Sequence, residues 1–164
     1  MDFDVSGKLP AGLHSYTIEE FIAQFVDGFP TSMRRKTIFD AMVEFLKELN
    51  ASGIPYEFWV DGSYTTTKIN PNDADIVVFL QIPQYNALGP QFGDLRNKYR
   101  VNLDLYFAVA TSDENRKMVD SRTFLNITNQ RNYWRGQFGF DREDKPKGIV
   151  CLSSVSLKDY IDRR

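Results

Sequence analysis

Two aspartates, Asp73 and Asp75, follow ten residues after a Gly62-Ser63 pair, and these four residues have types and spacing that suit phosphate chemistry. A polar loop separates the two pairs, and Asp-x-Asp then opens an apolar run that is typical of a strand. Side chains two positions apart on a strand point to the same face, so both carboxylates should project together. Two carboxylates held that close repel each other unless a cation or a proton lies between them.

Magnesium suits this pair of acids, because it prefers oxygen ligands and is commonly held by one or two carboxylates plus substrate phosphates. Gly62 would let a phosphate approach the backbone closely, and Ser63 offers an amide and a hydroxyl as donors. Lys68, between the two motifs, could neutralise phosphate charge or could be an exposed loop lysine. The pattern predicts a site for a nucleoside triphosphate with Mg²⁺, or Mn²⁺ in its place.

A third acid fits the same chemistry. Asp104 is the lone charge at the centre of an apolar run over residues 100–109, which we expect to be a buried strand. A buried carboxylate without a partner is costly, and a shared metal site would compensate that cost. Two metals about 3.5–4 Å apart could then clamp the attacking and leaving oxygens of a phosphoryl displacement.

Together these motifs resemble the signature of the polymerase-beta-like nucleotidyltransferase superfamily. That signature consists of Gly-Ser or Gly-Gly, a short gap, Asp-x-Asp or Asp-x-Glu, and a third Asp on a later strand. The resemblance implies that Asp73, Asp75 and Asp104 are catalytic and hold the metal. It also implies that Gly62 and Ser63 bind the triphosphate.

The chain as a whole also resembles a group of short, largely uncharacterised bacterial nucleotidyltransferase-like proteins. The shared segments are Leu9–His14, Asp61–Tyr64, Thr67–Lys68, Trp134–Arg135 and Pro146–Val150. Small members of the superfamily often serve in toxin–antitoxin or phage-defence systems. The resemblance therefore implies such a setting, with a partner protein encoded nearby.

From these features we expect a metal-dependent nucleotidyltransferase that moves a nucleoside monophosphate from an NTP, ATP among the candidates, to a hydroxyl of a protein or RNA acceptor. Two alternatives stay open. One is a non-catalytic regulatory module of the same fold that binds a nucleotide or a partner. The other is a synthase of a small signalling nucleotide. The base preference, the acceptor and the oligomeric state stay open as well.

Other residues have two interpretations each. Arg135, Arg142 and Lys147 lie in a C-terminal third with net positive charge, where they could reach phosphates or an acceptor, or simply be solvated. Tyr64 or Phe140 could stack on a base, or could belong to the core.

Composition limits the classes of protein. With 164 residues, of which 42% are hydrophobic, we expect one globular domain over residues 1–164. A net charge of −2 does not indicate a protein that coats nucleic acid, and a single cysteine excludes an intramolecular disulfide and a cysteine-rich zinc site. The start, Met1–Asp4, has no secretory signal pattern, and no apolar stretch could span a bilayer. We therefore expect a cytoplasmic protein without a membrane partner.

The order of elements predicts an α/β (α+β) fold, a minimal nucleotidyltransferase fold with a small mixed sheet and helices packed on one face. Residues 1–16 look irregular, and residues 84–98 are ambiguous. Thr17, Thr31 and Ser112 could each cap a helix. Expected strands cover about 56–61, 74–80, 100–108 and 148–152, and expected helices about 17–28, 31–51 and from 113 onward, with a helix or irregular segment near 124–134 and a helical turn at 157–161. This order would bring the Gly-Ser pair and all three acids to one end of the sheet.

Overall fold

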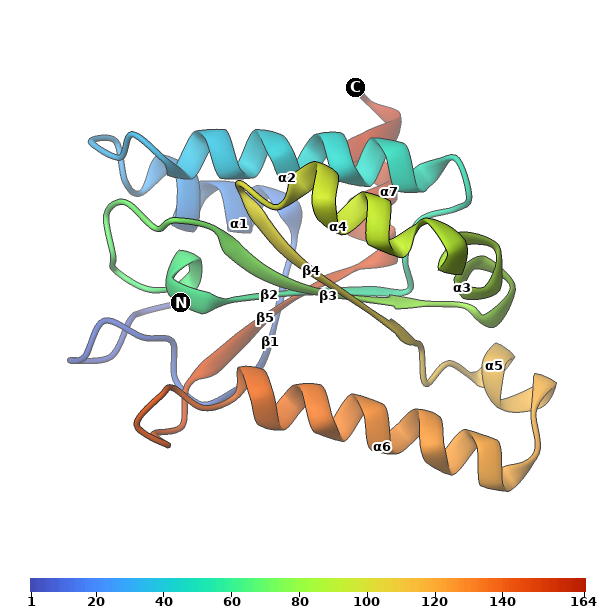
Figure 1. Cartoon of the computed structure of the whole chain (residues 1–164). Helices are drawn as coiled ribbons and strands as arrows, with labels where there is room; N and C mark the ends of the chain where they lie inside the picture. Colours follow the sequence, from blue (N-terminus) through green and yellow to red (C-terminus); the bar gives the residue numbers. More distant parts are fainter.

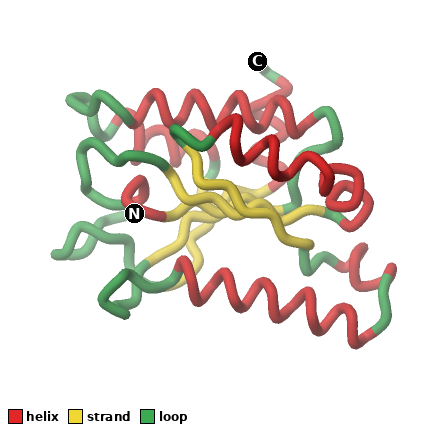
Figure 2. The backbone as a smooth tube through the Cα atoms, in the orientation of Figure 1, coloured by secondary structure: helices red, strands yellow, loops and turns green.

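A computed structural model describes residues 1–164 and contains a five-stranded mixed sheet between two layers of helices (Figure 1). Figure 2 shows the strands running through the middle of the molecule. The strand order is β1-β5-β2-β3-β4, in which β1 pairs with β5 and β3 with β4 in parallel, and the other neighbours are antiparallel. The strands are β1 (Gly12–Tyr16), β2 (Glu57–Asp61), β3 (Ala74–Leu80), β4 (Leu103–Val109) and β5 (Gly148–Ser153).

The helices occupy most of the remaining chain. They are α1 (Ile18–Ile22), which continues as the π-helical turn η1 (Ala23–Asp27), α2 (Arg35–Asn50), the 3₁₀ turns η2 (Gly62–Thr65) and η3 (Gly89–Gln91), α3 (Ile82–Leu88), α4 (Phe92–Tyr99), α5 (Asp113–Met118), α6 (Ser121–Phe138) and α7 (Ser154–Asp162). No helix combines the length and the apolar character needed to cross a membrane.

The predicted α+β class is confirmed, but the helices do not all lie on one face. In Figure 1, α1, α2, α4 and α7 lie on one side of the sheet and α6 lies on the other. The prediction of helices on one face is therefore wrong for α6. The physical reason is that both faces of the sheet are apolar. Trp59, Val77 and Ile149 point away from α2, and together with Phe138 of α6 they form a second buried cluster.

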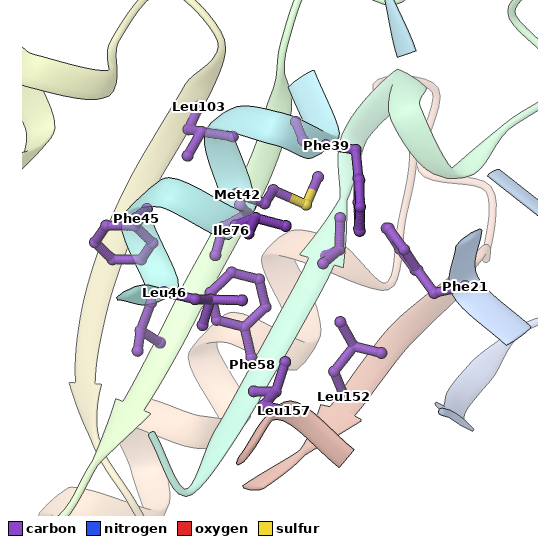
Figure 3. Close-up of a cluster of buried hydrophobic side chains, with 14 of the residues drawn as sticks. Phe21, Phe39, Met42, Phe45, Leu46, Phe58, Ile76, Leu103, Leu152 and Leu157 are labelled. Carbon is purple, nitrogen blue, oxygen red and sulfur yellow. The ribbon is translucent and has the colours of Figure 1, made fainter. Parts of the chain in front are cut away.

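The larger core lies between α2 and the opposite face of the sheet. The predicted inner stripe of α2, which includes Met42, Phe45 and Leu46, packs there against strand residues such as Phe58 and Ile76 (Figure 3). These side chains are almost fully buried. Since apolar area removed from water contributes about 25 cal/mol per Å², this layer is the main source of stability.

Two local signals at helix starts are confirmed. The Thr17 hydroxyl accepts the amide of Glu20, and the Glu20 carboxylate accepts the amide of Thr17, so both halves of the capping box form. The Ser112 hydroxyl likewise accepts the amide of Asn115 at the start of α5. The ambiguous region 84–98 turns out to be helical, in α3, η3 and α4.

Two other local predictions are wrong. Thr31 does not cap α2, which begins only at Arg35, because the Ser32 hydroxyl accepts the amides of Arg34 and Arg35 in a turn before the helix. Residues 1–16 are not entirely irregular, since β1 pairs along its whole length with β5. Strand formation there depends on a partner far away in the sequence, and not on local propensity.

Arg35 ties the loop after β2 to the helical layer. Its side chain is fully buried, and its guanidinium lies 3.6 Å from the centre of the Phe29 ring. The guanidinium donates to four backbone carbonyls, those of Phe25, Tyr64, Thr66 and Lys68. Burial lowers the pKa of Arg35 to about 10, which still leaves it charged at neutral pH. One cation thus holds the segment between the Gly-Ser pair and the Asp-x-Asp motif.

We expect Arg35→Met to lower the free energy of unfolding by about 3 kcal/mol or more, because four backbone carbonyls, two of them in buried hydrogen bonds, lose their donor. Lys36→Met removes the neighbouring charge, whose side chain is 77% exposed in an ion pair with Asp40, and should cost less than about 0.5 kcal/mol. Urea unfolding of both variants measures this difference. Equal stability of the two variants would contradict the anchoring role of Arg35.

Candidate active site

Three carboxylates lie in a row across neighbouring strands at one end of the sheet. Asp75 of β3 pairs in register with Asp61 of β2 on one side and with Asp104 of β4 on the other. Residues in matched register share a face of the sheet, and here it is the face covered by α6. Asp73 lies two residues before Asp75. The prediction that the acids meet at one end of the sheet is confirmed.

The acids line a cleft of about 770 Å³. All six residues predicted for the site contribute to it: Gly62, Ser63, Lys68, Asp73, Asp75 and Asp104. The opposite wall comes from the end of α6, through Trp134 and Phe138, and from the loop that follows, through Phe140, Arg142 and Lys147. The helix on the second face of the sheet, whose position the sequence did not reveal, therefore contributes to the wall of the cleft.

Gly62 is required by the close approach of two strands. Its φ of +80° lies in the left-handed region that favours glycine. A Cβ at this position would lie 2.5 Å from Oδ2 of Asp75, which is less than a van der Waals contact. The absence of a side chain thus lets the Asp75 carboxylate lie directly against the backbone before Ser63.

The carboxylates in this row repel one another. Burial, together with the charges of Asp73 and Asp104, raises the pKa of Asp75 to about 6, although Lys147 and Arg142 oppose the shift. Like charges this close disfavour full ionisation, and a cation among them would restore it. The donor set, carboxylate oxygens without sulfur or imidazole, is the set that Mg²⁺ and Mn²⁺ prefer.

The side chains do not converge fully on one point. No group of three or more His, Cys, Asp or Glu side chains lies close enough together to hold a metal ion by itself. An ion at the acids would therefore take further oxygen ligands from substrate phosphates, as Mg²⁺ commonly does. The roles of Asp73, Asp75 and Asp104 as metal ligands stay a prediction.

Asp104 is not buried, contrary to expectation. It is exposed because it faces the cleft, whereas Leu103 and Leu105 on the opposite face of the same edge strand are buried. Its Oδ2 accepts a hydrogen bond of 2.7 Å from the hydroxyl of Tyr106, two residues later on the same face. The Tyr106 ring packs against Trp134 of α6 at 4.6 Å between ring centres. Sequence reasoning missed Tyr106, although the two-residue strand repeat could have placed it beside Asp104.

Asp61 and Lys147 form an ion pair inside the cleft that sequence reasoning also missed. Their atoms Oδ2 and Nζ lie 2.6 Å apart. Asp61 stands directly before Gly62, so its position in the motif was a usable signal. Its partner Lys147 lies 86 residues later, and no sequence signal connects the two residues. Among the other cations in the cleft, Lys8 pairs with Asp141, while Lys68 and Arg142 make no ion pair.

Of the other residues considered from the sequence, some line the cleft and others do not. Arg135 does not line the cleft, but a smaller depression beside it. Tyr64 is not available to stack on a base, because it is fully buried against Phe21 and donates its hydroxyl to the Arg35 carbonyl. Phe140 does line the cleft and is 47% exposed.

A comparison with protein families gives one match, which covers residues 1–153 and is described as a family of unknown function, DUF6932. The chain belongs to that family. All residues that line the cleft lie within the range that matches DUF6932. Neither the curated proteins nor the solved structures give a match.

Gly62→Ala should distort the site. The added methyl group would meet Asp75 Oδ2 and would force a strained φ, so we expect the free energy of unfolding to fall by about 1–3 kcal/mol. Gly136→Ala in α6 is the matched control. A Cβ there meets nothing within 4 Å, and alanine should stabilise the helix by up to about 1 kcal/mol. Thermal unfolding of both variants checks the opposite signs, and a neutral Gly62→Ala would contradict the close approach.

Asp75 should make stability depend on pH. Its pKa is raised in the folded state, so between about pH 4 and pH 7 the unfolded chain loses the proton first and stability falls as pH rises. Asp75→Asn removes this loss. In metal-free buffer, we expect the stability of Asp75→Asn relative to the natural protein to increase by about 1–2 kcal/mol from pH 4 to pH 7. Urea unfolding across this range measures the trend, and a difference that does not change with pH would argue against a strained Asp75.

Proposed function

We propose that this protein is a nucleotidyltransferase that moves a nucleoside monophosphate from an NTP to a hydroxyl of a protein or RNA acceptor. The observation that carries the proposal is the joint position of two motifs in one cleft. The acids Asp73, Asp75 and Asp104 line the same cavity as Gly62, Ser63 and Lys68, although the motifs come from different strands and loops.

The carboxylates are suited to hold Mg²⁺, or Mn²⁺ in its place. Asp73, Asp75 and Asp104 would bind the ion, which when bound neutralises phosphate charge and lowers the pKa of an attacking hydroxyl. The raised pKa of Asp75 supports this assignment, because it reflects burial and the nearby negative charges of Asp73 and Asp104. The repulsion within the row is what a divalent cation would relieve.

The side chains of the cleft divide the work on the substrates. Lys68 and Arg142 have no carboxylate partner, so their charges are available for a triphosphate. The missing side chain of Gly62 and the hydroxyl of Ser63 leave room and a donor for phosphate oxygens. Trp134 and Phe140 offer aromatic surface for a base at the other wall.

In the transfer, the acceptor oxygen forms a bond to the α-phosphorus, and the bond from that phosphorus to the bridging oxygen of the β-phosphate breaks. Pyrophosphate leaves with the bonding electron pair. The acceptor proton passes to the Asp104 carboxylate, which is the exposed acid on the edge strand. A small chain has no additional lobe to hold a template. We therefore favour an RNA end or a protein side chain as the acceptor over processive polymerisation. A toxin–antitoxin or phage-defence role with a partner protein encoded nearby would suit this reaction.

The test is incubation with each α-labelled NTP and Mg²⁺, alone and with cell extract. We expect label on protein or RNA, a loss of more than about 100-fold in Asp73→Ala, and full labelling in Asp159→Ala, an exposed acid on α7. A labelled small nucleotide without a macromolecular acceptor would instead support a synthase of a signalling nucleotide. Nucleotide binding without transfer under any condition would contradict the proposal and favour a regulatory module.

A further inference from the structure

The ion pair between Lys147 and Asp61 lines the cleft and is largely buried. Its side chains are only 11% and 4% exposed. Asp61 ends β2 and Lys147 directly precedes β5, and these strands pair in antiparallel register up to Val60 and Val150. The Lys147 amide also donates to the Gly139 carbonyl, which closes the loop after α6. The backbone of Lys147 is therefore held by Gly139, and its ammonium group is held by Asp61.

Both members of the pair have hydrogen-bonding capacity that no other protein group uses. Oδ1 of Asp61 is buried and has no hydrogen-bond partner. An ammonium group has three donors, and Lys147 uses one of them, toward Asp61 Oδ2. Its remaining donors belong to a side chain that lines the cleft.

A purely structural role explains this arrangement poorly. Burying a lysine and an aspartate is costly, and apolar residues of similar volume usually serve stability as well or better. Buried polar groups without partners are rare in folded proteins and call for a specific reason. The unused donors of Lys147 are such groups, and with the unpaired cations Lys68 and Arg142 in the same cleft they favour an anionic ligand. The unpartnered Oδ1 of Asp61 is an acceptor, so it would face a donor or a cation and not the anion itself.

We propose that Lys147 binds the phosphate chain of the substrate and that Asp61 is the residue that positions it. This inference rests on the proposed function and assigns a further group to its site. Asp61 holds the ammonium in the cleft, and the unused donors contact phosphate oxygens. The ligand class is a polyphosphate, whatever base it carries.

The experiment measures binding of inorganic tripolyphosphate with Mg²⁺ by calorimetry, so that neither base recognition nor turnover enters. We expect Lys147→Met to weaken binding by about 10- to 100-fold, since one charged contact is lost. Asp61→Asn should weaken binding only a few-fold, because the ammonium group stays but is held less firmly. Lys145→Met is the matched control. It removes the same charge from the same loop, at a side chain 69% exposed and paired with Glu143, and should bind like the natural protein.

The double variant Asp61→Asn, Lys147→Met separates the two possible roles. If Lys147 binds phosphate, the double variant stays as weak as Lys147→Met. If Lys147 only neutralises Asp61, the double variant regains natural affinity, and the inference is overturned. Natural affinity in Lys147→Met, with an intact melting curve, overturns it too. If the natural protein itself does not bind tripolyphosphate or ATP with Mg²⁺, then the proposed function falls with the inference.

Discussion

The character of the cleft depends on the repulsion among carboxylates that the sheet holds in register. Neighbouring strands are about 4.8 Å apart, so Asp61, Asp75 and Asp104 cannot separate without breaking the backbone hydrogen bonds of β2, β3 and β4. Positive charge has to come from elsewhere. Lys147 supplies part of it, while burial and the charges of Asp73 and Asp104 still keep the pKa of Asp75 raised. A bound cation would relieve this repulsion.

The rest of the fold keeps this arrangement in place and makes it accessible. The buried Arg35 fixes the loop that carries Ser63 and Lys68 through the carbonyls of Tyr64, Thr66 and Lys68. On the other face, α6 and the loop after it bring aromatic and cationic groups opposite the acids. The cleft therefore has one wall of sheet carboxylates and one of mixed aromatic and basic groups, and the proposal of a nucleotide ligand rests on this arrangement.

The sequence predicted what depends on local patterns. Periodicity found β3 and the stripe of α2, and the Thr17 and Ser112 caps follow from side chains three residues apart. It missed what depends on distant partners. β1 is a strand only because β5 lies beside it, and Lys147 meets Asp61 only after folding. The position of α6 followed from the second apolar face of the sheet, which alternation in single strands does not reveal. The motif predicted that the acids and the Gly-Ser pair lie close together. This geometry follows from one antiparallel pairing, β2 with β3, and one parallel pairing, β3 with β4.

The central claim is that Asp73, Asp75 and Asp104 hold a divalent cation together with a triphosphate. Crystals grown with Mn²⁺ and a non-hydrolysable NTP test it directly through anomalous scattering. The account predicts an anomalous peak with oxygen ligands from these carboxylates and from the phosphates, beside Gly62. A nucleotide bound elsewhere, or a peak that touches none of the three acids, would contradict it.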